Sequence, residues 1–532
     1  MRRSVYVLAA ACTAMLLVAP LASAIGPGGW DRVGVGVPPA TSSLNGAVYA
    51  LNTQNPGVLY AGGNFTSAGG NTNAAHIARW SGTSWSALGT TPLTGDVHAI
   101  AYAAGRVYAG GTFLNAGANA NADFLAVWDG SAWAPFCNST VPGPAFTGNV
   151  NALQIIGNTL YVGGSFQNGA GLVTADYLVG CDLTSGAASS TVLTDGDFSG
   201  SVYALTADSN GTLYAGGGFI NVAAIPEADH VAAYDGSWHA MGGGPAVDSF
   251  VRSLTASATN VYVGTDSVDV AGIANADHVA RWNGTAWSAV GSNSAGTNGW
   301  FSTTTTIDAL ATYGSIVIAA GSFQNANGNA AADGIAYFDG TNWRPIGSNG
   351  AGNGPLPAHV VALGLTGGKL YAGGNFTTAG GDSLGRFLAA YALRLPDASI
   401  AAGTASPYVG NNVYSATGAG EGRSVTVTRG HSVSSYIRVQ NDGLVAASIT
   451  VKGTGGATGI AAHYYRNGAS LTTAVRAGTY VTPILAPQAY VVIQLVVTVA
   501  RPSAATATIT TTIRSQIGIA PDAVRVVVKA TG

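Results

Sequence analysis

A motif recurs every 50 residues or so through the first three quarters of this chain, and it restricts the possible folds more than any other feature. Its anchor, V-x-A-L with small variations, starts at seven positions: Val48, Val97, Val150, Val202, Val251, Ile307 and Val360. The spacings are 49, 53, 52, 49, 56 and 53 residues. A glycine pair or single glycine follows every anchor in phase, and a phenylalanine follows in six copies. Such phase-locked self-similarity predicts a repeat architecture.

Each unit contains four short apolar runs, which in the first copy are Val48–Leu51, Leu59–Gly63, Ile77–Trp80 and Ser84–Leu88. In most copies Asp-Gly, Asn-Gly or Ser-Gly separates the third and fourth runs, as at Asp129-Gly130. Such pairs between apolar runs favour tight hairpins, because the turn residues take positive φ. The unit therefore predicts a four-stranded antiparallel sheet, and seven such sheets predict a seven-bladed β-propeller over residues 25–396.

The seventh unit lacks a fourth run, because the chain passes from Arg386–Tyr391 directly to Leu395-Pro396. The missing pattern appears at the other end, where GGWDRVG at Gly28–Gly34 resembles the fourth run at Ser84–Gly89. We therefore predict that Trp30–Val33 supplies the outer strand of the last blade and leaves no blade incomplete. The alternative is that Trp30 is an unrelated N-terminal aromatic residue.

The phrase LYAGGNF…IARWSGTSWSALG, Leu59–Gly89, resembles the kelch-like repeats of the Rax2-like family and of many exported bacterial proteins. The resemblance extends over about 370 residues. It implies an extracellular or cell-surface propeller, a class that often has no assigned chemistry.

The N-terminus has the pattern of a secretory signal peptide over residues 1–24. Arg2 and Arg3 precede the apolar run Val5–Leu21, and Ala22-Ser23-Ala24 is a small-residue cleavage motif. We predict cleavage after Ala24 and a secreted or cell-surface protein; the alternative is a membrane anchor. Later segments contain no comparable apolar run, so we expect no membrane insertion of the mature chain.

Composition limits the partners and raises the question of a disulfide. Charged residues make up 8% of the chain and the net charge is −3, without the basic patch that nucleic-acid binding requires. We expect a monomer with an extracellular glycan or protein ligand.

After the signal only Cys137 and Cys181 remain, and an exported chain favours pairing. Their positions towards opposite ends of their own units argue against it, so both states stay open.

From Pro396 onwards the repeat stops, and alternating runs rich in Val, Ile and Thr predict an immunoglobulin-like β-sandwich over residues 397–532. The runs YIRVQNDG and ASITVKG, at Tyr436–Gly443 and Ala447–Gly453, resemble CARDB-like modules. The expected strands are Ser424–Thr428, Ser435–Gln440, Ala447–Lys452, Ala461–Tyr465, Ala489–Val499, Ala507–Ile513 and Ala523–Lys529.

Two rows of polar residues are candidate sites. The residue after each anchor varies and is largely polar: Tyr49, His98, Asn151, Tyr203, Arg252, Asp308 and Val361. It forms either a hydrated channel rim or a ligand-contacting ring at the mouth of a central pocket. The second row, before the third run, is Asp123, Asp176, Asp229, Asp277 and Asp333. These carboxylates are expected to accept backbone N–H bonds from their own loops, with calcium as the alternative.

No catalytic residue, metal ligand or cofactor site emerges from the sequence. The motifs G-x-S-x-G, H-E-x-x-H and C-x-x-C are absent, and His230 and His278 occupy one repeated position rather than a converging site. Copper radical oxidases of the kelch type need a Tyr–Cys cross-link and two His ligands. We therefore expect a non-catalytic extracellular binding or adhesion scaffold. Its ligand is expected on the face that carries the loops between second and third runs and the loops from each fourth run to the first run of the next unit. The alternative is a secreted propeller enzyme acting on glycans.

Overall fold

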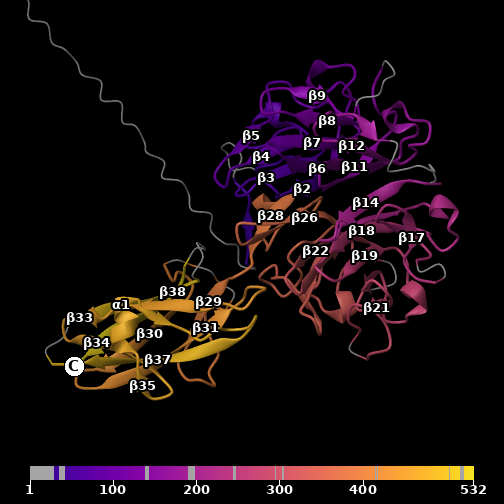
Figure 1. Cartoon of the computed structure of the whole chain (residues 1–532). Coiled ribbons are helices and arrows are strands. Elements are labelled where there is room, and N and C mark those ends of the chain that lie inside the picture. The colour runs from indigo at the N-terminus through magenta and orange to yellow at the C-terminus, as the bar shows by residue number, and fades with distance from the viewer. Residues whose placement is uncertain are drawn as a thin grey trace, which may run out of the picture.

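The computed structural model of the chain describes residues 29–34, 42–137, 143–189, 198–243, 247–293, 295–301, 305–411, 413, 415, 417–501, 504–515 and 521–532. The expected signal peptide Met1–Ala24 and its cleavage site lie outside these residues. Strands dominate and confirm the all-β class. They gather into two bodies, one coloured indigo to orange and one orange to yellow (Figure 1). No helix in the described residues has the length and apolar character needed to span a bilayer.

Each repeat unit forms one four-stranded antiparallel sheet, so the described residues contain seven of them. The first strands are β2 Val48–Asn52, β6 Val97–Ala103, β10 Val150–Ile156, β14 Val202–Ala207, β18 Val251–Ala256, β22 Ile307–Tyr313 and β26 Val360–Thr366. The second strands are β3 Leu59–Gly63, β7 Arg106–Gly111, β11 Thr159–Gly164, β15 Leu213–Gly217, β19 Val261–Thr265, β23 Ile316–Gly321 and β27 Lys369–Gly374.

The outer half of each sheet follows the same order. The third strands are β4 Ile77–Trp80, β8 Leu125–Trp128, β12 Leu178–Asp182, β16 Val231–Tyr234, β20 Val279–Trp282, β24 Ile335–Phe338 and β28 Leu388–Ala392. The fourth strands are β5 Trp85–Ala87, β9 Trp133–Pro135, β13 Ala188–Ser189, β17 Trp238–Ala240, β21 Trp287–Ala289, β25 Trp343–Pro345 and, in the seventh sheet, β1 Trp30–Arg32. One-turn 3-10 helices precede the third strands: η1 Thr72–Ala74, η2 Ala116–Ala118, η3 Gly169–Gly171, η5 Val222–Ala224, η6 Val270–Gly272, η7 Ala326–Gly328 and η8 Ser383–Gly385.

Contact between sheets explains why the valine anchor and the glycine pair recur in phase. A Cβ atom added to Gly62 would lie 2.5 Å from Cγ1 of Val97, the anchor of the next sheet. The same close approach joins the seventh sheet to the first, where a Cβ on Gly373 would lie 2.6 Å from Cγ1 of Val48. Real Cβ atoms do not come this close, so a side chain here would push the sheets apart. Equivalent pairs are Gly110 with Val150, Gly163 with Val202 and Gly216 with Val251.

The first strands contact one another in succession, β2 with β6, β6 with β10, and so on to β22 with β26. Strand β26 in turn contacts β2. The anchor residues inside these strands are fully buried. The first strands therefore pack against one another from sheet to sheet, and the second, third and fourth strands of each sheet follow outward from them in order.

The pairing predicted for the N-terminal segment is confirmed. Strand β1 runs antiparallel to β28, with Trp30 opposite Tyr391 and Arg32 opposite Ala389. The Trp30 indole is 1% exposed, and its ring centroid lies 5.4 Å from that of Tyr391. Five other sheets carry an equivalent aromatic pair between third and fourth strands, such as Trp80 with Trp85. The first segment of the chain thus occupies the place of an ordinary fourth strand.

Tryptophan indoles of the fourth strands also tie neighbouring sheets together. Trp30 donates its indole N–H to the Ile346 carbonyl at 2.8 Å, and Trp85 donates to Val33 at 3.1 Å. The same bond runs from Trp133 to Leu88, from Trp287 to Met241 and from Trp343 to Val290. Because a buried indole N–H needs an acceptor, these bonds fix how each sheet sits on the preceding one. The N-terminal segment takes part as both donor and acceptor.

Cys137 and Cys181 form a disulfide, so the sequence argument against pairing was wrong. That argument compared each cysteine only with its own unit, whereas the bond joins two neighbouring sheets. At other junctions the second residue after the fourth strand is a glycine against a third-strand aromatic of the next sheet: Gly34 against Trp80, Gly89 against Trp128 and Gly291 against Phe338. Cys137 takes the glycine position with a φ of 63°, and Cys181 takes the aromatic position. The disulfide therefore replaces a packing contact.

The second body consists of two facing sheets. One has the order β29 Pro396–Ala401, β31 Ser432–Asn441, β37 Tyr490–Val499, β34 Ile460–Arg466 and β33 Gly456–Ala457, with β35 Ala469–Ser470 beside β34. The other has the order β30 Gly422–Thr428, β39 Asp522–Thr531, β38 Thr506–Ser515, β32 Ile449–Gly453 and β36 Tyr480–Val481. A helix, α1 Thr472–Ala477, packs beside β32 and β34. Alternate residues of both sheets form one buried core, as in a sandwich. All seven expected runs contain strands, whereas β29 and the two-residue strands β33, β35 and β36 were missed.

The two bodies touch where the chain passes from β28 to β29. The Tyr391 hydroxyl donates to the Asp442 carbonyl at 2.8 Å, and the Asp442 N–H donates to Leu395 at 2.7 Å. Leu444 is buried in the same apolar cluster as Trp30. A cavity of about 300 Å³ lies at this junction, lined among others by Arg344 and Gln488. The connection is thus packed rather than a free linker.

Buried carboxyl groups meet inside the sandwich and make its stability depend on pH. Glu421, Asp397 and Asp522 are each at most 1% exposed, and Asp522 accepts backbone N–H bonds from Ala398 at 2.6 Å and Ser415 at 2.8 Å. Burial, reinforced by the charges of Asp522 and Asp397, raises the pKa of Glu421 far above its ordinary 4.5. Burial also raises the pKa of Asp522. At least one proton is therefore held in the folded state near neutral pH.

A carboxyl group whose pKa is raised by folding stabilises the fold below its unfolded pKa and loses that contribution as pH rises. We expect the sandwich to lose up to about 1.4 kcal/mol of unfolding free energy per pH unit from about pH 5 upwards. Glu421→Gln mimics the protonated form and should flatten this slope. The measurement is amide hydrogen exchange of β39 in both variants at pH 5 and pH 8. Equal protection ratios at the two pH values would contradict the expectation.

Candidate functional site

The residue after each anchor is the extra residue of a β-bulge. In all seven sheets the register between first and second strands shifts across it, as between Val48 and Ala50 or Val251 and Ser253. A bulge leaves this residue without a ladder partner and re-aims its side chain. The polar row Tyr49, His98, Asn151, Tyr203, Arg252, Asp308 and Val361 is therefore a row of bulged residues.

Five members of this row line one open cavity of about 230 Å³: Tyr49, His98, Arg252, Asp308 and Val361. The rest of its lining consists of small and apolar residues one and two positions after the bulged residue in the first strands, such as Ala50 and Leu51. Asn151 and Tyr203 occupy equivalent bulges but do not line the cavity. The register places the starts of first strands, the ends of second strands and the starts of third strands at one edge. We call the cavity and this surrounding edge the mouth.

Tyr49 and His98 form an aromatic pair on one side of the mouth. Their ring centroids are 5.6 Å apart in an edge-to-face arrangement, and Asn64 donates its amide N–H to the Tyr49 hydroxyl at 2.8 Å. Burial raises the pKa of Tyr49, and the nearby Asp96 carboxylate adds to the rise. Burial lowers the pKa of His98, partly offset by Asp96. The pair is neutral near pH 7 and offers hydrogen bonds rather than charge.

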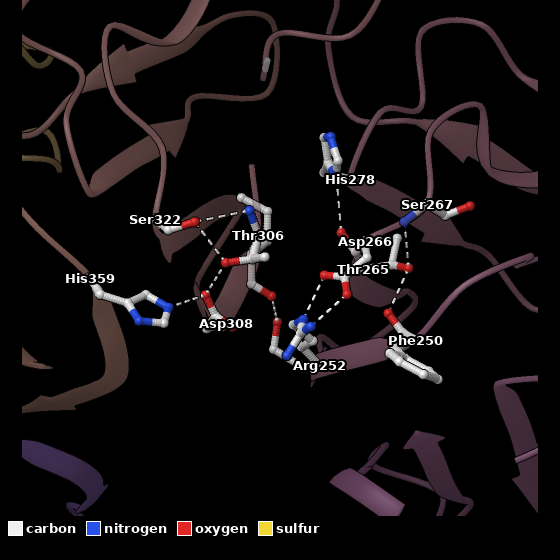
Figure 2. Close-up of polar contacts among 12 residues, drawn as sticks. Phe250, Arg252, Thr265, Asp266, Ser267, His278, Thr306, Asp308, Ser322 and His359 are labelled. Atoms are coloured by element: carbon white, nitrogen blue, oxygen red, sulfur yellow. Dashed lines mark hydrogen bonds and ion pairs between the residues drawn. The ribbon is translucent and has the colours of Figure 1, made fainter. Parts of the chain in front are cut away.

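Arg252 is held rigidly by a carboxylate of its own sheet. Its Nε lies 2.5 Å from one Asp266 oxygen and its second guanidinium nitrogen 2.6 Å from the other (Figure 2). This two-bond geometry fixes the guanidinium plane. The Asp266 hydrogen bonds and charge, with a smaller contribution from Asp308, raise the pKa of Arg252. The side chains are 38% and 24% exposed, so both remain accessible to a ligand.

Asp308 joins a second polar group across two sheets. One of its oxygens lies 2.6 Å from Nε2 of His359 and accepts the Thr306 hydroxyl at 2.5 Å (Figure 2). Ser322 lies 2.8 Å from the same hydroxyl. Since His359 precedes the anchor of the last repeat unit, this chain of contacts links the sixth and seventh sheets. The mouth thus holds an Arg–Asp ion pair on the fifth sheet and, beside it, a hydrogen-bonded Asp–His group between the sixth and seventh sheets.

Sequence analysis missed several of these partners. His359 precedes the anchor of the seventh unit, and Asp266 stands two residues after Gly264 of the fifth unit. The position before the anchor also varies between units: Ala47, Asp96, Asn149, Ser201, Phe250, Thr306 and His359. That variation could have identified these residues as site candidates. The residue before the anchor, the bulged residue after it and the residue that follows the second strand all lie at the same edge of the sheet.

The aspartate row has the structural role expected from sequence. Asp123, Asp176, Asp229, Asp277 and Asp333 each accept the backbone N–H of the residue eight positions earlier, at 2.6 to 3.3 Å. The residues bonded in this way all have left-handed backbone conformations, as Asn115 does at a φ of 53°. Each carboxylate therefore closes its own loop.

The histidine row is also structural. His76, His230 and His278 each place Nδ1 within 3.1 to 3.3 Å of a carbonyl at the end of the second strand. In the described residues, no three His, Cys, Asp or Glu side chains are grouped as metal ligands. The mouth offers hydrogen-bonding and ionic groups from several sheets.

No protein family matches the sequence. No curated protein matches it either. Solved structures that are similar to parts of the chain include a domain, a pilin subunit and an enzyme. The CARDB domain of the PF1109 protein in complex with di-metal ions, from Pyrococcus furiosus, matches at 12% identity and a TM-score of 0.16, over 26% of this chain and 90% of that one. The CooA pilin subunit of enterotoxigenic Escherichia coli matches at 9% identity and a TM-score of 0.17. The match covers 25% of this chain and 97% of the pilin subunit.

A family 123 glycoside hydrolase from Clostridium perfringens matches at 8% identity and a TM-score of 0.19, over 26% of this chain. The chain spans only 28% of the length of that hydrolase. At these scores the similarities support no inference about function.

Proposed function

We propose that this chain is an extracellular, non-catalytic binding or adhesion scaffold that takes its ligand at the mouth. In this proposal residues 25–396 form a closed seven-bladed kelch-like β-propeller, and residues 397–532 form an immunoglobulin-like sandwich that acts as spacer or second contact. The succession of contacts between first strands, from β2 through β26 and back, supports closure. The disulfide supports an oxidising compartment outside the cytosol.

One observation carries the binding role. Seven bulges at equivalent positions direct a varied set of side chains to one edge, and five of those side chains surround a single cavity. At other positions of the repeat, packing between sheets restricts the residue type, as where a glycine of one sheet contacts the valine anchor of the next. The bulged position is not restricted in this way and carries Tyr, His, Arg and Asp in different units. Such a varied set of polar side chains suits selective contact with a ligand.

The test is a ligand screen that also measures turnover. The mature chain, with its metal content determined, is incubated with an array of defined glycans and with extracellular proteins from candidate hosts. We expect reversible binding with every glycan recovered unchanged. Cleavage or oxidation of a bound glycan would contradict the non-catalytic role and favour the secreted-enzyme alternative.

A further inference from the structure

Two aromatic rings stand exposed beside the mouth, on neighbouring sheets. Phe250 precedes the anchor of the fifth sheet and is 43% exposed, and Tyr203 is the bulged residue of the fourth sheet and is 37% exposed. Their centroids are 6.1 Å apart and their planes nearly perpendicular, at 82°. Large aromatic rings are usually buried, so their exposure at a varied position calls for a partner.

The fold holds this pair in place from beneath. The Phe250 carbonyl accepts the Thr265 hydroxyl at 2.9 Å and the Asp266 N–H at 3.1 Å, which fixes its backbone (Figure 2). A Cβ added to Gly218 would lie 3.1 Å from Phe250 Cε1 and 3.6 Å from the Tyr203 hydroxyl oxygen. Gly218 stands where other sheets carry Asn64, Thr112 or Asp266. The missing side chain therefore gives the two rings room to lie against the sheet.

Polar groups of fixed geometry adjoin the rings. Asp266 binds Arg252 through both oxygens, yet the guanidinium has five N–H donors and the carboxylate about four acceptor positions, so both retain capacity. The charge of Arg252 is already balanced by Asp266, and Asp308 is paired with His359. A free phosphate or sulfate would need a cation without such a partner. The site suits a neutral ligand that donates and accepts hydrogen bonds at adjacent atoms.

A saccharide ring has this chemistry, because its C–H groups form an apolar face while its hydroxyl groups donate and accept around the edge. Aromatic rings complement the first feature, and planar charged groups complement the second. We propose that the mouth binds a neutral saccharide whose ring packs on Phe250 and Tyr203 while neighbouring hydroxyls bond to Arg252 and Asp266. This inference rests on the proposed binding function and names its ligand class.

The experiment uses the full mature chain with two probes. One is the set of methyl glycosides of glucose, galactose, mannose and N-acetylglucosamine, observed by saturation-transfer NMR; the other is an array of defined oligosaccharides. We expect saturation to reach the ring C–H protons of a bound sugar. Phe250→Ala should weaken binding about tenfold or more, and Tyr203→Ala should weaken it too, whereas Tyr203→Phe should keep most of it.

The matched control is Leu114→Ala, since Leu114 is 44% exposed in the loop between the second and third strands of the second sheet, where the described residues form no Arg–Asp ion pair beside it. Its affinity should match that of the parent within twofold, and all variants should keep the parent melting temperature. Equal affinity of Phe250→Ala and Leu114→Ala would overturn the stacking role. Failure of all saccharides, together with capture of a protein at the mouth, would overturn the saccharide inference and leave the proposed binding function standing.

Discussion

Replacing Trp30 by alanine should cost roughly 3–5 kcal/mol of unfolding free energy, as expected for a large buried aromatic side chain. The indole is 1% exposed, packs on Tyr391 and donates to the Ile346 carbonyl of the preceding sheet. The substitution thus removes ring packing within the seventh sheet and a hydrogen bond to the sixth. Chemical denaturation of the mature chain, followed by tryptophan fluorescence and circular dichroism, measures the loss.

Trp133→Ala is the matched control, because Trp133 is buried in an internal sheet and donates in the same way to Leu88 at 3.0 Å. If β1 is an integral fourth strand, both substitutions should cost similar amounts. A loss below about 1 kcal/mol for Trp30→Ala, beside a large loss for Trp133→Ala, would mean that the N-terminal strand is dispensable.

Removal of the disulfide should cost roughly 2–4 kcal/mol, because the bond closes a loop across 44 residues and constrains the unfolded chain. The suitable variant is Cys137→Gly with Cys181→Ala. Glycine is chosen because Cys137 has a φ of 63°, a conformation that glycine adopts without the strain other residues incur. The variant loses the covalent link without adding backbone strain.

The measurement compares denaturant midpoints of the parent and this variant, each with and without a reducing agent. On reduction the denaturant midpoint of the parent should fall towards that of the variant, and the midpoint of the variant should not change. A parent that is insensitive to complete reduction, verified by thiol titration, would show that the bond adds no stability at this junction.

Much of the fold could be predicted from the sequence because its causes repeat. Asp-Gly and Asn-Gly pairs mark the hairpins locally, as at Asp129-Gly130. The expected positive φ holds there for Gly130 alone, at 103°, because Asp129 instead accepts the backbone N–H groups of Ser131 and Ala132. The glycine pair and the valine anchor recur because each sheet needs one to accommodate the other, as Gly62 does for Val97. The partner of β28 could also be predicted, because the segment GGWDRVG repeats the sequence pattern of the fourth strands.

The features that sequence reasoning missed depend on contacts between units. Cys137 and Cys181 meet because the end of one fourth strand packs on the third strand of the next sheet, which a comparison within one unit does not reveal. The bulge at Tyr49 or Arg252 is a shift of one residue in register, and the anchor motif gives no sign of it. Without the bulge, the convergence of Asp266 and His359 on the same edge could not be foreseen.

The most direct test of the central claim is to map ligand affinity across the two faces of the first body. Using the tightest ligand from the screen, we expect Arg252→Ala and His98→Ala each to weaken binding by about 1–3 kcal/mol while the fold is kept. Asp129→Ala, in a hairpin turn at the opposite edge, should leave affinity unchanged. The contrary result, full affinity in both mouth variants and its loss in Asp129→Ala or on deletion of the sandwich, would place the ligand elsewhere and reduce the first body to a rigid spacer.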